Sequence, residues 1–243
     1  MCSGRVDLEF VLRAFSNGMD GVFIGGCRLN ECNYITHGNY HALSLAFLCR
    51  RIMEHIGLNP ARLRIEFMTS GEGILFADLM SQFAGNVNQI GPLGTAEGIK
   101  QNELRSKLAE IRKLVPYIKL VKKEKLSSRP EDLEAYDKLF TRDEIDNLFR
   151  EVTSYYIDPK KCEACMTCAQ RCPVEAVISA KNQIHVIDQD KCIKCGTCFE
   201  ACPPRFGAVT KIAGGPVPPP LPEGERTIVR KKDSSKLKAQ SSK

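Results

Sequence analysis

The sequence predicts an α/β domain, followed by a helical connector and a small α+β domain. Three observations indicate this organisation. Apolar residues in positions 1–94 alternate between helical and strand spacing, positions 95–153 are charged with helical periodicity, and eight of the twelve cysteines lie between positions 162 and 202. The expected domains therefore span residues 1–94, 95–153 and 154–213, and residues 214–243 form a tail.

The composition is that of an ordinary globular protein, with 43% hydrophobic and 26% charged residues. No apolar run approaches the about 20 residues that a membrane-spanning helix needs. Arg5, Asp7 and Glu9 interrupt the N-terminus where a secretory signal would carry its apolar core. We therefore expect a cytoplasmic protein without a membrane span, whose cysteines are metal ligands and not disulfide partners.

The N-terminal domain is expected to alternate helices and strands. A first helix ends before Gly18, residues 22–24 form a short buried strand with a glycine turn after it, and a second helix ends at Gly57. The apolar stripe of the first helix is Leu8, Val11, Leu12 and Phe15, and that of the second helix is Leu45, Leu48, Cys49, Ile52 and Ile56.

Residues 64–68 alternate like a second strand, and Ser70 is placed to cap a third helix. This order of elements predicts a parallel sheet with right-handed crossovers, as in flavodoxin-like domains. Open α/β domains normally begin with a strand, whereas Met1 and Cys2 look like the end of one. We therefore expect the domain to lack its first strand. The expected buried face of the third helix is Phe76, Leu79, Met80, Phe83, Val87 and Ile90.

The connector is expected to pack on its neighbours through one apolar stripe, with Pro116 as a kink. Its lysine-rich run at 119–125 is compatible with nucleic-acid contact, but neither an aromatic platform nor a helix-turn-helix pattern accompanies it. We expect a solvated face there and no nucleic-acid partner. The apolar stripe is Leu104, Leu108, Ile111, Val115 and Ile118.

The tail is basic and rich in proline. Five of the thirteen prolines lie within residues 216–222, and seven lysines and arginines outnumber three acidic residues. Because few apolar side chains are available for burial, residues 214–243 are expected to be disordered. The tail carries +4 of the net charge of +6, so the basic balance says little about the partners of the folded domains.

Residues 157–209 contain an internal repeat built on cysteine. Each half has the spacing C-x2-C-x2-C-x3-C-P, and every cysteine of the second half lies thirty positions after its counterpart. A [4Fe–4S] cluster needs four thiolates. A loop with cysteine at every third position supplies three, and its fourth cysteine serves the other cluster. We expect one cluster on Cys162, Cys165, Cys168 and Cys202, and a second on Cys192, Cys195, Cys198 and Cys172.

Structural zinc is the alternative interpretation, but zinc ribbons use two C-x2-C pairs with four ligands in total. The doubled motif resembles that of bacterial-type two-cluster ferredoxins, over residues 155–212. The resemblance implies an α+β domain that carries electrons one at a time. Because eight cysteine ligands leave no iron open to substrate, we expect no catalytic residue in this domain.

Three further cysteines are candidates for another site. Cys27 follows the expected strand at 22–24, Cys2 ends the inferred preceding strand, and Cys32 forms a C-x4-C spacing with Cys27. In open parallel sheets, cofactors bind outside the carboxyl ends of strands. The three thiols therefore indicate an iron–sulfur site with its fourth ligand missing. A pair of buried or free thiols is the alternative interpretation.

The remaining candidate ligands are weaker. Cys49 lies on the apolar face of the second helix, so we expect a core thiol. His37 and His41 lie near Cys32, and two histidines replace two cysteines in Rieske centres. Capping or packing is the favoured role for this pair.

Three strings stand out in the first 95 residues. They are MCSGRVDLEFVLRAF, GMDGVFIGGCRLNECNYITHGNYHA and the stretch that ends in GPLG. They resemble the delta subunit of the methyl-viologen-reducing hydrogenase. The resemblance implies a [2Fe–2S] cluster, and Cys2, Cys27 and Cys32 match cysteines of that family. That family also has an upstream paired-cysteine motif on its first strand-to-helix turn, and this sequence starts after that point.

The resemblance also implies partners. Members of that family pass electrons from a hydrogenase or formate dehydrogenase to the flavoprotein subunit of heterodisulfide reductase. Fusion to a two-cluster ferredoxin resembles the iron–sulfur subunits of heterodisulfide-reductase-like complexes in anaerobic bacteria and archaea. We therefore expect a non-catalytic electron-transfer subunit with two [4Fe–4S] clusters and a candidate [2Fe–2S] cluster.

Two alternatives belong to other functional classes. A flavin- or nucleotide-dependent oxidoreductase would have its active site on the α/β domain, served by the ferredoxin domain, but no G-x-G-x-x-G follows a strand. A regulatory module would use the clusters structurally and bind nucleic acid through the basic tail. Stoichiometric flavin would support the first alternative, and salt-sensitive DNA binding would support the second.

Overall fold

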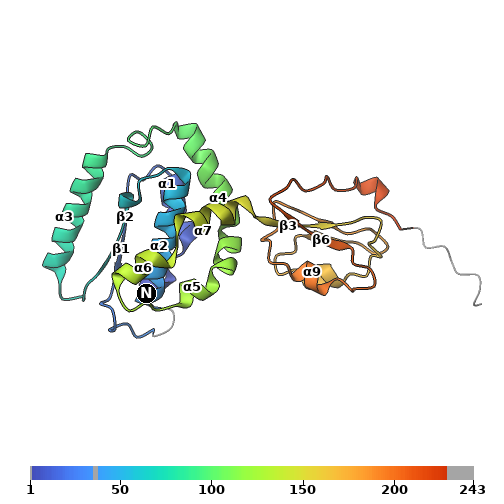
Figure 1. Ribbon diagram of the computed structural model, residues 1–243, viewed down its shortest axis with the longest axis horizontal. Helices are drawn as coiled ribbons and strands as arrows, with labels where there is room; N and C mark the ends of the chain where they lie inside the picture. Colours follow the sequence, from blue (N-terminus) through green and yellow to red (C-terminus); the bar gives the residue numbers. More distant parts are fainter. Residues whose placement is uncertain (1, 35–37, 229–243) are drawn as a thin grey trace, which may run out of the picture. The chain divides into compact units, whose positions relative to one another are not determined.

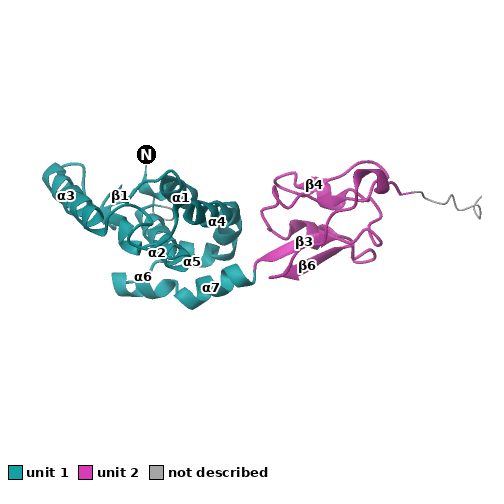
Figure 2. Cartoon of the chain, turned by 90° about the horizontal axis from the view of Figure 1, so that it is seen from above, with its two compact units in different colours: residues 1–151 teal, residues 152–243 magenta. Residues whose placement is uncertain are grey.

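The computed structural model describes residues 2–34 and 38–228. The chain divides into two compact units, residues 1–151 and residues 152–243 (Figure 2). Within the described residues, no helix combines the length and apolar character that crossing a membrane requires.

Two parallel strands form the sheet of the first unit. β1 (Val22–Gly26) pairs with β2 (Leu63–Phe67), with Val22 opposite Leu63 and Gly26 opposite Phe67. The chain between them contains α2 (Asn39–Ile56), which supplies the crossover that a parallel pair requires. The parallel sheet predicted from the alternation of helices and strands is confirmed.

The first two helices bury the stripes expected of them. α1 (Leu8–Ser16) is capped by the side chain of Asp7, which accepts a hydrogen bond from the backbone N–H of Glu9. α2 ends at Gly57, whose φ of +87° is the left-handed conformation that glycine adopts without strain. All the apolar positions predicted for these two helices are buried.

The third helix, α3 (Gly73–Ile90), differs from its prediction in two respects. It begins after Glu72 instead of Ser70. Residues 69–72 form a turn, in which the backbone N–H of Glu72 donates to Thr69 O and the backbone N–H of Thr69 donates to the Glu72 carboxylate. Of its predicted apolar face only Phe83 is buried, and Phe76 is 47% exposed. Figure 1 shows α3 on the opposite side of β1 and β2 from α2. A sheet of two strands is too narrow to bury a helix of 18 residues.

The segment predicted as a connector packs within the first unit. It forms α4 (Gln101–Val121), α5 (Lys123–Ser127), α6 (Leu133–Leu139) and α7 (Arg142–Arg150). α4 contacts α1, while α5, α6 and α7 contact α2. The predicted stripe of α4 is buried, and Pro116 lies inside this helix.

The solvated face predicted for the lysine-rich run is found only in part: Lys123 is exposed, but Lys122 is buried. Lys119 forms an ion pair with Asp7, and Lys122 forms one with Glu144. Lys125 lies 2.7 Å from the same Glu144 carboxylate. Burial alone would raise the pKa of Glu144, but the hydrogen bonds from the two lysines lower it overall. These lysines therefore stabilise the helix packing of the first unit.

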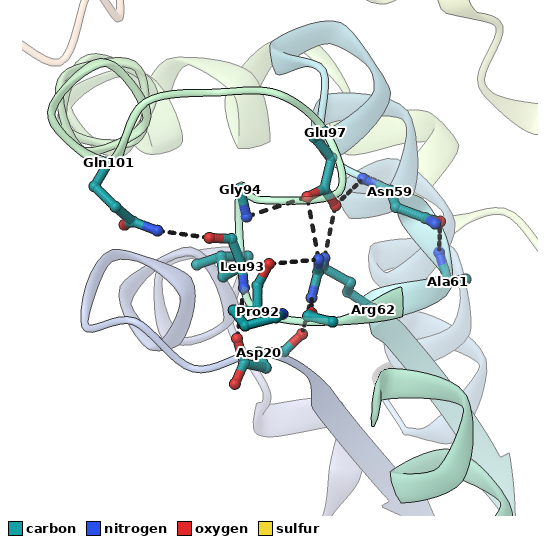
Figure 3. A network of polar contacts seen from close by, with 10 residues as sticks. Asp20, Asn59, Ala61, Arg62, Pro92, Leu93, Gly94, Glu97 and Gln101 are labelled. Atoms are coloured by element: carbon teal, nitrogen blue, oxygen red, sulfur yellow. Dashed lines mark hydrogen bonds and ion pairs between the residues drawn. The ribbon is translucent and has the colours of Figure 1, made fainter. Parts of the chain in front are cut away.

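A buried arginine fixes the loop after α3 (Figure 3). Arg62 is fully buried, and its five N–H groups donate to five oxygens. Two of these oxygens are the carboxylate of Glu97, which also accepts from the backbone N–H of Gly94 and Asn59. The other three are the backbone carbonyls of Asp20, Gly91 and Pro92. The network joins the start of β2 to the loop that contains the GPLG string.

The second unit is an α+β fold with two antiparallel strand pairs. β3 (Thr153–Ile157) pairs with β6 (Val209–Ala213), and β4 (Val177–Ile178) pairs with β5 (Val186–Ile187). A short helix follows the cysteine loop of each half, α8 (Thr167–Gln170) and α9 (Thr197–Ala201). The buried core of this unit combines strand residues with cysteines: Tyr155, Ile157, Cys168, Val177, Ile187, Cys198, Ala208 and Val209.

Part of the tail packs on the second unit. The backbone N–H of Ile184 donates to Arg226 O at 2.7 Å, and that of Ile228 donates to Asn182 O at 2.8 Å. A short 3-10 helix, η3 (Glu223–Glu225), precedes these contacts. The end of this segment is therefore held against the unit instead of disordered, because the turn at 182–184 offers it backbone partners, with an isolated antiparallel bridge between Gln183 and Thr227. The rest of the predicted tail lies outside the described residues.

Candidate iron–sulfur sites

Two cavities in the second unit collect the eight cysteines of the repeat. Each cavity is lined by three cysteines of one half and the fourth cysteine of the other half. The first group is Cys162, Cys165, Cys168 and Cys202. The second group is Cys172, Cys192, Cys195 and Cys198. The structure thus brings the cysteines together in the two crossed groups of four that the repeat spacing predicts.

Both cysteine loops contain residues in the left-handed backbone conformation. Ala164 and Met166 have φ of 50° and 65°, and their counterparts thirty positions later, Lys194 and Gly196, have φ of 57° and 83°. Such a run curls the chain around a centre and directs backbone N–H groups inward. The N–H of Lys194 lies 3.4 Å from Sγ of Cys192. The repeat is therefore a repeat of backbone conformation as well as of cysteine spacing.

The electrostatics of the two groups fit a metal cluster. Burial, together with the neighbouring thiols, raises the pKa of Cys168 to about 11 and that of Cys198 to about 12. Buried thiols at such close quarters are costly to ionise by themselves. Coordination by iron reverses this cost, because a metal-bound thiol is deprotonated. Four converging sulfurs form the donor set that a [4Fe–4S] cluster takes.

Sequence reasoning missed one residue at the first group. His185 is buried, and its Nδ1 lies 3.2 Å from Sγ of Cys168. The sequence offered one signal for it, its position in the repeat. His185 lies thirty positions after Tyr155, and the same spacing separates each cysteine of the second half from its counterpart.

The N-terminal cysteines lie near the carboxyl end of β1. Cys2 caps a 3-10 helix, η1 (Ser3–Arg5), and its Sγ lies 3.5 Å from Sγ of Cys32. Cys27 directly follows β1, and the Asn39 side chain donates to its carbonyl oxygen at 2.9 Å. Among the described residues, no three Cys, His, Asp or Glu side chains form a group that could hold a single metal ion. The structure therefore presents a close pair, Cys2 and Cys32, with Cys27 beside it.

The thiols of this group differ in acidity. Burial, and then the neighbouring Cys32, raise the pKa of Cys27. For Cys32, burial alone would raise the pKa, but hydrogen bonds from the backbone of Tyr34 and Asn39 lower it overall. Gly38 permits this packing, since a Cβ there would lie 2.4 Å from Sγ of Cys32.

The other candidate ligands are Cys49 and two histidines. Cys49 is fully buried in α2, and burial raises its pKa to about 12, as expected for a core thiol. His41 lies on α2 and lines a cleft together with Cys2 and Tyr34. His37 lies outside the described residues.

Comparison with known proteins agrees with this division. Residues 1–91 match the family described as methyl-viologen-reducing hydrogenase, delta subunit, and residues 154–205 match the 4Fe-4S dicluster domain. An iron-sulfur protein of the F420-non-reducing hydrogenase of Methanopyrus kandleri is 32% identical over 92 residues, which are 38% of this chain and 69% of that relative. The chain belongs to the hydrogenase delta-subunit family.

Two other relatives are similar to part of the chain. The corresponding iron-sulfur protein of the F420-non-reducing hydrogenase of Archaeoglobus profundus is 42% identical over 91 residues, 37% of this chain. One component of the ferredoxin:CoB-CoM heterodisulfide reductase of Methanosarcina mazei is 39% identical over 113 residues, 46% of this chain. The matches span 66% of the length of the first relative and 14% of the second.

Proposed function

We propose that this chain is an iron–sulfur electron-transfer subunit. It passes electrons between a donor of the hydrogenase or formate dehydrogenase type and a heterodisulfide-reductase-like flavoprotein complex. The observation that carries the proposal is the crossed arrangement of eight cysteines around two cavities. The names of the relatives, hydrogenase and heterodisulfide reductase subunits, support the choice of partners.

The two cavities are assigned to two [4Fe–4S] clusters. The first group of cysteines ligates one cluster and the second group ligates the other. Each half of the repeat therefore supplies ligands to both clusters. Such clusters take up and release one electron at a time. Because four thiolates occupy the four irons of each cluster, substrate has no coordination position. The role of the protein is therefore to hold the clusters, exclude water and tune their potentials, without catalytic residues of its own.

The N-terminal thiols are assigned to a [2Fe–2S] cluster that requires a further ligand. Cys2, Cys27 and Cys32 are its candidate ligands, supported by the 3.5 Å approach of Cys2 to Cys32. We further propose that β1 and β2 belong to a flavodoxin-like sheet, in which this site lies at the carboxyl edge. A reducing cytoplasm suits a chain whose cysteines must remain available as thiolates.

The first test is the iron content of the full-length protein purified without oxygen. Two [4Fe–4S] clusters require about eight irons per chain, and an additional [2Fe–2S] cluster raises the content to about ten. Reduction by dithionite should bleach the cluster absorption. Zinc in place of iron would overturn the proposal. Stoichiometric flavin would instead support a flavin-dependent oxidoreductase.

Two ligand variants test the assignment of each group. Cys168→Ser should lose the first cluster, and Cys198→Ser should lose the second, so that each variant retains about four of the irons of the two [4Fe–4S] clusters. Iron analysis and EPR spectra of the reduced proteins measure the loss. Cys49→Ala, a change in the core of the first unit, is the matched control and should retain all the iron. Full iron in either serine variant would contradict the assignment of that group.

A further inference from the structure

The cysteine repeat extends to two rings that lie beside the cavities. Tyr155, on β3, and His185, which directly precedes β5, are thirty positions apart, the spacing that relates the two sets of cysteines. Tyr155 lines the cavity of the second group, and His185 lines that of the first. The two halves therefore place equivalent rings of different chemistry beside the two cysteine groups.

His185 is a buried hydrogen-bond partner of a cysteine. Its side chain is 1% exposed, and its Nδ1 lies 3.2 Å from Sγ of Cys168. Its Nε2 is buried without a hydrogen-bond partner among the described residues. A proton on Nε2 would leave a donor unpaired and turn a lone pair of Nδ1 toward the sulfur. The tautomer with the proton on Nδ1 avoids both costs and donates to Cys168.

The ordered part of the tail covers this ring. Pro218, Pro220 and Leu221 line one cavity together with His185, and the backbone bond from Ile184 to Arg226 holds the segment in place. A hydrogen bond that is kept from water is electrostatically stronger than an exposed one. The tail therefore adds to the effect of the histidine on the sulfur.

We propose that His185 donates a hydrogen bond from Nδ1 to the thiolate of Cys168 and thereby raises the reduction potential of the first cluster. This inference rests on the proposed cluster assignment. When the cluster gains an electron from a reductant, negative charge on its thiolates increases, and an N–H donor stabilises the reduced state more than the oxidised state. At the second group the equivalent ring is Tyr155, which packs against Gly196. The effect of His185 is therefore expected on the first cluster.

The second group has an asymmetric residue of its own. Lys194 replaces the Ala164 of the first half, and its Nζ lies 2.7 Å from Oγ of Ser154. Lys194 directly precedes Cys195, and its positive charge favours reduction of the second cluster. Because the histidine and the lysine act on different clusters, the two potentials must be measured separately.

The experiment is an EPR-monitored redox titration of the full-length protein, with dithionite as reductant. His185→Leu removes the donor. We expect the equilibrium constant for reduction of one cluster to fall about tenfold, which is about 59 mV for a one-electron couple, while the other cluster is unchanged. Lys194→Met should lower the other couple alone, and it thereby identifies the second cluster.

A conservative variant separates hydrogen bonding from packing. His185→Asn places an amide N–H where Nδ1 stood, so the potential of the first cluster should stay close to that of the native protein. His185→Phe provides a ring like that of Tyr155 without a donor, and it should lower the potential as His185→Leu does. This second donor-free variant keeps the test decisive when the leucine variant fails to assemble.

Each outcome decides a different claim. Unchanged potentials in donor-free variants that hold about eight irons would overturn the inference and leave the proposed function standing. Equal shifts in the leucine and asparagine variants would assign His185 to packing and also overturn it. Native protein without iron would overturn the proposed function itself.

Discussion

At the scale of single residues, Gly196 shows how a missing side chain positions a cysteine loop. Its φ is +83°, and a Cβ at this position would lie 2.7 Å from the hydroxyl oxygen of Tyr155. The counterpart in the first half is Met166, which has a φ of 65°. A left-handed backbone alone therefore does not require glycine here. The close approach of the Tyr155 ring does.

Gly196→Ala should displace the second cysteine loop and weaken the second cluster before the first. The left-handed conformation costs an alanine about 1–2 kcal/mol, and the clash with Tyr155 adds to this cost. Iron retention during incubation with a chelator measures the effect, with EPR spectra to show which cluster is lost.

A double variant identifies the cause of that loss. Tyr155→Phe removes the hydroxyl that the new Cβ would meet, so Gly196→Ala combined with Tyr155→Phe should retain more iron than Gly196→Ala alone. Gly224→Ala, where a Cβ would meet no atom within 4 Å, is the matched control. Equal iron loss in the single and double variants would assign the effect to the backbone and not to the clash.

At the scale of elements, periodicity predicted which residues share a face but not what covers that face. The stripes of α1, α2 and α4 are buried as predicted, because each helix packs against another helix of the first unit. The stripe of α3 has the same spacing, but two strands bury only Phe83. The cysteine groups were more predictable, since the ligand spacing specifies both halves of each site. The contact of His185 with Cys168 was not predictable from spacing alone, because it depends on how the residue before β5 packs against the first cysteine loop.

The lysine run and the buried arginine show a second limit at this scale. Lys122 and Arg62 look like solvated charges in the sequence. In the structure, Lys122 forms an ion pair with Glu144, and Arg62 forms one with Glu97. Charge pairing between elements requires knowledge of how the elements pack. No local pattern in the chain reports it.

Glu97→Gln should strongly destabilise the first unit. It leaves the buried guanidinium of Arg62 without its counter-charge, and breaking a buried pair in this way costs about 3–5 kcal/mol. Glu103→Gln, which breaks an exposed pair with Lys107, is the matched control and should cost far less. Denaturant unfolding monitored by circular dichroism compares the two variants. Equal costs would contradict the role assigned to the Arg62 network.

The same pair predicts how stability depends on pH. Burial alone would raise the pKa of Glu97, but the hydrogen bond from Arg62 lowers it overall, below the ordinary value of 4.5. A carboxyl group whose pKa is lower in the folded state contributes its full stability above the unfolded pKa and loses it as the pH falls toward the folded pKa. Native protein should therefore lose stability below about pH 4.5 more steeply than the Glu97→Gln variant. Parallel acid unfolding curves would contradict this expectation.

At the scale of the whole molecule, the two units owe their stability to different sources. The first unit buries helix stripes against one another and against a sheet. The second unit has short strands of two to five residues, and two of the eight residues in its buried hydrophobic cluster are cysteines. A core in a domain of this size rarely supplies more than about 3–5 kcal/mol. We therefore expect the proposed clusters to supply much of the folding free energy of the second unit.

Removal of iron should accordingly unfold the second unit and leave the first one folded. When the full-length protein is treated with bipyridyl, limited proteolysis should cut within residues 152–228 and spare a fragment close to residues 1–151. Helical circular dichroism should largely persist, because the long helices α1, α2, α3 and α4 all lie in the first unit. The same treatment with bipyridyl already saturated with iron is the control. Persistence of residues 152–228 after complete iron loss would mean that the antiparallel strands and the ordered tail segment hold this unit without metal, and that the cysteines bind clusters in a preformed scaffold.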